Sequence, residues 1–162
     1  MIFTTKAEYG VRLLVELGRQ HGGDATAVPV SLKAIAEAEG LPLAYLERIV
    51  ALLKKADLVE ATRGAHGGYR LTRAPEDVHM DEVVLALEGA VAPMTCFVDD
   101  AEGGRVLCSH EADRGHGCAT KLLWTRVQGG VVKALAATSL AELVAFSNTN
   151  RPVAAPERAV VV

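Results

Sequence analysis

The sequence predicts a mainly α-helical fold with a small β-hairpin wing, namely a winged helix-turn-helix domain followed by a long C-terminal dimerisation helix. Residues 32–56 hold two apolar-periodic segments separated by a short turn. Two β-prone runs then flank a glycine-rich tip, and an apolar stripe follows in residues 119–137. The predicted parts are a winged helix-turn-helix DNA-binding domain (1–75), a connecting helix and cysteine-rich loop (76–118), the dimerisation helix and a final short helix (119–147), and a flexible tail (148–162).

The first three helices follow from apolar spacing and turn residues. Residues 5–20 form the first, Ser31 is a suitable N-cap for a short helix over 32–39, and Gly40 opens the turn before a helix over 42–56. The second helix of such a pair enters the major groove of DNA. The side chains that the apolar pattern leaves outside are therefore predicted DNA contacts: Ala44, Tyr45, Glu47, Arg48 and Lys55.

The hairpin predicted after this helix is the wing. Its strands are Leu58–Thr62 and Tyr69–Thr72, and three glycines in the tip between them permit a tight reversal. Arg63 stands at this tip and has the charge that suits a narrow minor groove. The chain has a net charge of −3, yet residues 48–73 hold six basic residues against two acidic ones. The positive charge thus lies where a helix and a wing would meet phosphates.

Composition narrows the class of protein. No stretch of 18 uncharged apolar residues occurs, and the first residues do not have the layout of a signal peptide. We therefore expect a cytoplasmic protein without a membrane partner. Aromatic residues make up only 4% of the chain, which argues against a platform for single-stranded nucleic acid. The sequence lacks a Ser/His/Asp set, a Walker motif and a dinucleotide loop, so an enzyme is not expected.

All three cysteines lie in one stretch of 23 residues, which is rich in glycine and acidic residues and is predicted to be a loop. They are Cys96, Cys108 and Cys118, with 11 and 9 residues between them. Clustered thiols in a reducing compartment indicate a thiophilic metal or an iron–sulfur cluster. A structural zinc, helped by His110 or His116, or a thiol switch would also use these residues.

The C-terminal part predicts helices over 80–88, 119–137 and 140–146, the last opened by a capping box of Ser139 and Glu142. The long middle helix is more apolar than an isolated surface helix requires. We therefore expect a homodimer whose interface contains Leu123, Trp124, Val127, Val131 and Leu135. Gly129 and Gly130 weaken the centre of this helix, so close packing is expected there.

Over residues 1–147 the chain resembles the Rrf2 family of bacterial transcription regulators, the group that contains IscR, NsrR and RsrR. The resemblance lies in the opening FTTKAEYGVRLL, in YLERIVALLKKADLV, in the wing sequence RGAHGGY, in the cysteine loop and in CATKLLW leading to TSLAELV. It implies a homodimer on a pseudo-palindromic double-stranded operator, most simply as a repressor. Binding would be controlled by a loop-held iron–sulfur cluster, [2Fe-2S] or [4Fe-4S].

The resemblance also implies which residues hold the cluster. IscR-like members keep five residues between cysteines and a histidine three positions after the last one, whereas this chain has Lys121 there. NsrR-like and RsrR-like members use a carboxylate from the other subunit's first helix, at the position of Glu8, and RsrR adds a histidine where this chain has Arg12. The implied ligand set is Cys96, Cys108, Cys118 and Glu8.

Two alternatives stay open. Glu8 could simply pair with Arg12 one helical turn later, and His110 or His116 could supply the fourth ligand. The alternative function is a winged-helix regulator without a cluster that responds to cysteine oxidation, zinc or a small metabolite.

Overall fold

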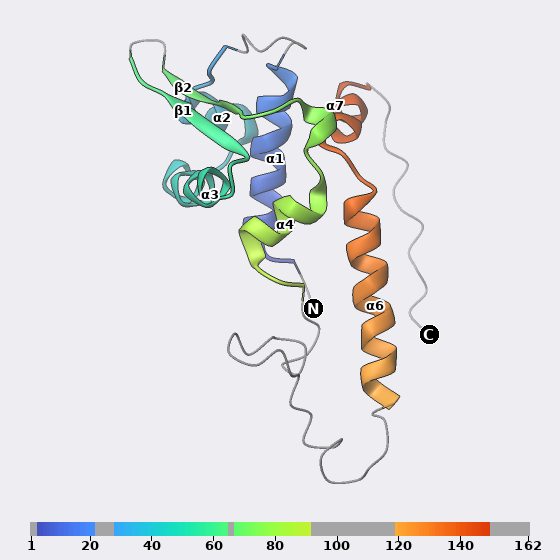
Figure 1. Cartoon of the computed structure of the whole chain (residues 1–162). Helices are drawn as coiled ribbons and strands as arrows, with labels where there is room; N and C mark the ends of the chain where they lie inside the picture. Colours follow the sequence, from blue (N-terminus) through green and yellow to red (C-terminus); the bar gives the residue numbers. More distant parts are fainter. Residues whose placement is uncertain (1–2, 22–27, 65–66, 92–118, 150–162) are drawn as a thin grey trace.

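The computed structural model describes residues 3–21, 28–64, 67–91 and 119–149 (Figure 1). The predicted cysteine loop and the C-terminal tail beyond Thr149 lie outside these ranges. The elements in chain order are α1 (Thr5–Arg19), α2 (Leu32–Glu39), α3 (Leu43–Lys55), β1 (Val59–Thr62), β2 (Gly68–Leu71), the 3₁₀ helix η1 (Pro75–Asp77), α4 (Met80–Glu88), α6 (Ala119–Ala136) and α7 (Leu140–Asn148).

This architecture confirms the predicted fold class, which is mostly helical with a two-stranded antiparallel hairpin. Apart from shifts of one residue at several element ends, two details differ from the sequence analysis. The short helix η1 was not predicted. The last helix continues to Asn148, two residues beyond the predicted end, so Asn148 belongs to α7 rather than to the tail.

A single hydrophobic core is built around α1. Leu13, Leu14 and Leu17 of this helix are almost fully buried and belong to one cluster with residues of α2, α3, both strands, α4 and α7. Figure 1 shows α1 in the centre of the domain, with α3, α4 and α7 around it. The cluster extends past residue 75, because Val83 and Leu87 of α4 and Leu140 of α7 lie in it. The helix that leads to the cysteine segment is thus packed directly against α1 and α3.

The helix-turn-helix unit forms as its cap residues predict. The Ser31 hydroxyl accepts a hydrogen bond from the Ala34 amide at 3.1 Å, which begins α2. Gly40 ends α2 in the left-handed conformation, with φ of 63°, a backbone geometry that glycine adopts without steric cost. Leu41 turns into the core, and α3 begins at Leu43 directly after Pro42. The turn therefore fixes the direction in which α3 leaves α2.

The wing is joined by a third segment of chain, which pairs with β2 near the tip end of the hairpin. Its strands pair with Val59 opposite Leu71 and Thr62 opposite Gly68. Val30 and Tyr69 exchange two backbone hydrogen bonds of 2.9 and 2.8 Å, so the segment before α2 pairs with β2. A Cβ atom on Gly68 would lie 2.5 Å from the Val30 carbonyl oxygen, which explains why glycine stands there.

Helix α6 differs from the other helices because none of its residues is buried. It stands beside α4 and points away from the core (Figure 1). The Gln128 side-chain amide donates to the Val91 carbonyl at 2.7 Å, which ties the middle of α6 to the chain just after α4. No helix among the described residues combines the length and the apolar character that crossing a bilayer requires.

Candidate nucleic-acid interface and regulatory site

Helix α3 separates its side chains into a buried and an exposed face. Leu46, Ile49, Val50 and Leu53 are buried in the core. Four of the predicted DNA contacts lie exposed on the other side: Ala44, Glu47, Arg48 and Lys55. Glu47 and Arg48 follow Ala44 by three and four residues, and Lys55 follows Arg48 by seven, which is two helical turns, so the four share one surface of the helix. This surface can enter a groove of DNA without disturbing the core.

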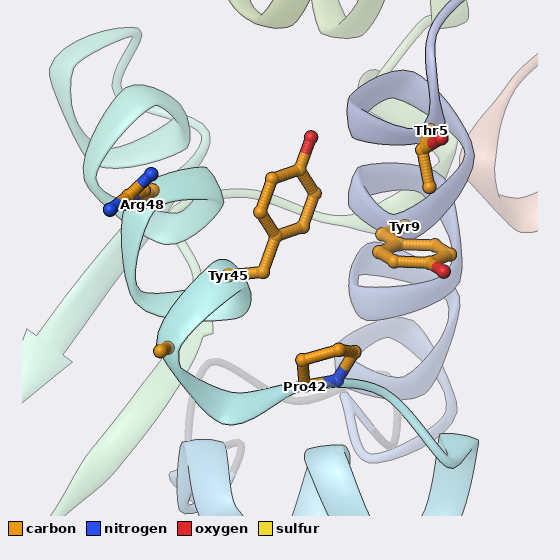
Figure 2. Close-up of a pocket in the computed structure, with 6 residues that line it drawn as sticks. Thr5, Tyr9, Pro42, Tyr45 and Arg48 are labelled. Carbon is orange, nitrogen blue, oxygen red and sulfur yellow. The ribbon is translucent and has the colours of Figure 1, made fainter.

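Tyr45, the fifth predicted contact on α3, is placed differently because it is only half-exposed. Its ring meets that of Tyr9 on α1 edge to face, with centroids 5.7 Å apart and planes at 89° (Figure 2). Such a pair is stabilising beyond the area that it buries. Tyr45 therefore links α3 to α1.

A shallow hollow lies between α1 and the first two turns of α3. It has a volume of about 550 Å³ and is lined by Thr5, Tyr9, Pro42, Ala44, Tyr45 and Arg48. Figure 2 shows the Tyr45 ring extending from α3 towards α1, with Tyr9 facing it and Pro42 at the turn. Most of the lining is carbon, and Arg48 provides a charge at one side.

The wing and the end of α3 supply positive charge. Lys54 and Lys55 lie in the last turn of α3, and Arg63 lies exposed directly after β1. Arg70 on β2 is paired with Glu60 on β1. Arg63 has no ion pair with any residue in the described parts of the chain, so its charge can pair with a phosphate of bound nucleic acid.

Glu8 lies in the first turn of α1, and its side chain is 63% exposed. The predicted ordinary pair with Arg12 is present, but the Arg12 Nη1–Glu8 Oε1 distance is 3.9 Å. Arg12 has a closer partner: its Nε donates to Glu39 Oε2 at 2.8 Å and its Nη2 donates to the Glu39 carbonyl. The guanidinium thus joins α1 to the last residue of α2, where a cation also interacts favourably with the helix dipole. Of the two acidic partners of Arg12, Glu8 is therefore the more distant.

The start of α1 is held by Glu88, the last residue of α4, in a contact that the sequence analysis did not predict. Glu88 Oε1 accepts from the Ala7 amide at 3.1 Å and from the Thr4 amide at 3.3 Å, and Oε2 lies 3.8 Å from Lys6 Nζ. The carboxylate therefore caps α1 from another helix. A residue that leads into the cysteine segment is bound to the helical turn that carries Glu8.

The predicted dimer residues fall on two faces of α6. Trp124, Val131 and Leu135 are half-buried, and Leu135 packs against the core. Leu123 and Val127 are 55% and 41% exposed. With Gly130 and Ala134 these two make an exposed stripe of small and apolar residues, spaced alternately by four and three. We call this set the α6 stripe; apart from the neighbouring backbone of α6 itself, no atom in the described parts of this chain lies within 4 Å of a Cβ built on Gly130.

Comparison with known proteins assigns the family. The family model described as "Rrf2: Iron-dependent Transcriptional regulator" matches residues 3–146. The chain belongs to the Rrf2 family. Among curated Rrf2 relatives, the protein rrf2 of Nitratidesulfovibrio vulgaris is 35% identical over 89% of this chain and 87% of its own length. CymR of Bacillus subtilis is 31% identical over 91% of this chain and 93% of its own length. IscR of Aliivibrio salmonicida is 31% identical over 89% of this chain and 77% of its own length.

Solved structures of Rrf2 proteins have the same fold. IscR of T. potens superposes with a TM-score of 0.69 and 32% identity, over 95% of this chain and 93% of that one. The structure of CymR of B. subtilis, described as its global cysteine regulator, superposes with a TM-score of 0.68 and 32% identity. The match covers 90% of this chain and 98% of that one. This Rrf2 protein is therefore a DNA-binding transcriptional regulator with a winged-helix domain, and not an enzyme.

The predicted cysteine ligands of this Rrf2 protein are not placed by the structure. Cys96, Cys108, Cys118, His110 and His116 all lie in 92–118, outside the described residues. Within the described ranges, no three His, Cys, Asp or Glu side chains come together as a metal site. Glu8 is thus the one member of the implied ligand set whose surroundings are defined.

Proposed function

We propose that this Rrf2 protein is a homodimeric repressor whose operator binding is controlled by an iron–sulfur cluster. Cys96, Cys108 and Cys118 of one subunit would hold the cluster together with Glu8 of the partner subunit. The observation that carries the proposal is the concentration of all three thiols between α4 and α6, directly after a helix whose last residue caps the turn that carries Glu8. When bound, the cluster would supply an iron centre that changes with redox state or is lost, and so a signal.

The surroundings of Glu8 fit a ligand role. Its carboxylate is largely exposed, and its 3.9 Å contact with Arg12 is of the kind that contributes little to stability. Arg12 keeps its 2.8 Å partner Glu39 if Glu8 is withdrawn. Because no buried charge would be left unpaired, Glu8 can change partner at small cost.

Contacts of α1 offer a route from this position to the DNA-binding surface. Tyr9 follows Glu8 in sequence, and its ring contacts Tyr45 on the recognition helix. The Arg12 guanidinium lies 6.0 Å from the centre of the Tyr9 ring and is bonded to the end of α2. A shift of the first turns of α1 would therefore move side chains that touch both helices of the helix-turn-helix unit.

The dimer explains how the chain would read an operator. In each subunit α3 enters the major groove and Arg63 of the wing reaches the adjacent minor groove, as the exposed faces allow. The α6 stripe would bury its apolar side chains against the same stripe of a second copy. Two-fold symmetry then requires a pseudo-palindromic site.

A second candidate function is a regulator without a cluster that uses the same cysteines as a thiol switch, or binds zinc or a small metabolite. The similarity to CymR favours it, since the B. subtilis protein is described as a cysteine regulator and a structure of Staphylococcus aureus CymR is described as an oxidised form. That S. aureus structure is 30% identical and has a TM-score of 0.65.

An absorption spectrum of anaerobically purified protein separates the two candidates. Cluster binding predicts a brown protein with visible charge-transfer bands and bound iron and sulfide. Replacing Cys96, Cys108 or Cys118 singly by Ala should remove or destabilise the cluster and leave the dimer folded. A protein that stays colourless after anaerobic reconstitution with iron and sulfide would favour the thiol, zinc or metabolite function. A cysteine variant with a wild-type spectrum would exclude that residue as a ligand.

A further inference from the structure

The hollow beside the recognition helix is open on the surface that α3 presents outward. Pro42, Ala44 and Arg48, three of its lining residues, are exposed. Its walls are the Pro42 ring, the Ala44 methyl group and the two tyrosine rings, whose edge-to-face contact fixes their relative position (Figure 2). An apolar recess thus stands at the N-terminal end of the helix, which is the end that reaches base edges in helix-turn-helix proteins.

The edges of DNA bases offer one apolar group to such a recess. In the major groove every base pair presents hydrogen-bond donors or acceptors, and only thymine adds a methyl group, at C5. Alanine is among the side chains that contact this methyl group. Building on the proposed function, in which α3 enters the major groove, we propose that the hollow reads the 5-methyl group of one thymine in each operator half-site. Ala44 makes the contact, and Pro42 and Tyr45 exclude water from it.

The charged neighbours of Ala44 determine which pairs flank the thymine. Glu47 and Arg48 lie three and four residues further on, so they are next to Ala44 on the same face. Arginine donates to the O6 and N7 atoms of guanine, and glutamate accepts from the N4 amino group of cytosine. The subsite therefore places a thymine beside a G·C pair in the half-site.

The test uses the full-length protein and its own binding site. Double-stranded sites are selected from a random library, and each thymine of the selected site is replaced in turn by deoxyuridine, which removes only the methyl group. We expect one position in each half-site at which this change weakens binding about four-fold, the effect of exposing one buried methyl group. Unchanged affinity at every thymine would overturn the proposal, while the selected site itself would still support the proposed function.

Two alanine variants assign the effect to the hollow. Ala44→Gly should bind the thymine and deoxyuridine sites equally, because the partner of the methyl group is gone. Ala51→Gly carries the same loss of helix propensity at an exposed position of α3 outside the hollow, and it should keep the four-fold difference. A difference that persists in Ala44→Gly would overturn the assignment. Failure to select any specific site would overturn both this proposal and the proposed function.

Discussion

Arg12 is the residue whose contacts define what Glu8 can do. Its guanidinium is bonded to the Glu39 side chain and backbone, contacts the Tyr9 ring and reaches Glu8 only at 3.9 Å. On sequence alone Glu8 and Arg12 look like a simple pair one turn apart. The structure shows that Glu39, 27 residues away, is the closer partner. No local pattern could indicate this, because the contact depends on how α2 packs against α1.

Glu8→Ala is expected to alter the cluster. A carboxylate oxygen binds iron less firmly than a thiolate, and its loss opens one position, so the visible and EPR spectra should change and cluster loss should accelerate. DNA binding should change only in the cluster-loaded form. The control is Glu16→Ala, which removes a carboxylate of α1 that is paired with Arg19 at 2.8 Å. Wild-type spectra and cluster lifetime in Glu8→Ala, together with an effect of changing His110 or His116, would place the fourth ligand within the cysteine segment.

Arg63→Ala is expected to weaken operator binding by about 1–3 kcal/mol and to lower the salt dependence, because the wing loses an unpaired cation. Arg70→Ala is the matched control: it removes the same charge from the neighbouring strand, where Glu60 already pairs with it. Fluorescence anisotropy titrations at several salt concentrations measure both variants. Equal losses in the two, or none in Arg63→Ala, would mean that the wing tip does not contact DNA.

Among the elements, α4 connects the parts of the molecule. Its Glu88 caps α1, and its Leu87 side chain packs so close to α1 that a Cβ on Gly10 would clash with Leu87 Cδ1. Near its other end, Glu82 pairs with Arg73, two residues after β2 ends, and accepts from the His79 amide at 2.9 Å. The helix that precedes the cysteine segment therefore contacts both α1 and the base of the wing.

Glu88→Ala should lower the free energy of unfolding by about 1–3 kcal/mol, because two amides at the start of α1 lose a charged acceptor. Glu37→Ala removes an exposed carboxylate from the 3.8 Å pair with Lys33 and should change stability by no more than about 0.5 kcal/mol. Urea unfolding at one fixed protein concentration compares the two. A loss in Glu88→Ala as small as that in the control would show that the cap does not hold α1.

The Glu82–Arg73 pair gives a pH-dependent contribution to stability. Burial by itself would raise the pKa of Glu82, but hydrogen bonds from Arg73 and the His79 amide, with the charges of these residues, hold the pKa below its ordinary value of 4.5. A carboxyl whose pKa is lower in the folded chain stabilises it above the unfolded pKa, and this stability disappears as pH falls through the folded value. Glu82→Gln should therefore flatten the loss of stability on acidification below the ordinary carboxyl pKa of 4.5. If the free energy of unfolding of Glu82→Gln falls with pH as steeply as that of the wild type, the pair does not contribute to stability.

Two adjacent glycines test the α6 stripe. Gly130 lies three residues after Val127 on the stripe, and Gly129 lies off it. Gly129→Ala should stabilise the chain by about 0.5–1 kcal/mol through helix propensity alone. Gly130→Ala brings the same propensity but adds a methyl group where a partner helix packs, so it should weaken the dimer by about 1–3 kcal/mol. Analytical ultracentrifugation measures both. If Gly130→Ala dimerises as well as Gly129→Ala, the interface lies on another face of α6.

At the scale of the whole molecule, sequence patterns were sufficient for the α-helices, for the wing strands and for the faces of α3, but not for the short helix η1. The helices and strands agree with prediction within a few residues, because apolar period, caps and turn glycines are local properties of the chain. They were not sufficient for α6. The apolar pattern predicted Leu123, Trp124, Val127, Val131 and Leu135 as one dimer stripe, whereas Trp124, Val131 and Leu135 are half-buried within the single chain, with Leu135 against the core, and Leu123 and Val127 are exposed. Contacts between distant segments, such as that between Glu88 and Thr4, which are 84 residues apart, also have no local sequence pattern that could predict them.

The central claim is that the state of the cysteine site controls operator binding through α1 and α4. The most direct measurement is the operator affinity of one anaerobic preparation, taken with the cluster loaded and again after the cluster has been removed by a chelator. The account predicts affinities that differ about ten-fold or more between the two forms, within the usual range of coupling between sites. Equal affinity of the cluster-loaded and cluster-free forms for the same operator would contradict it.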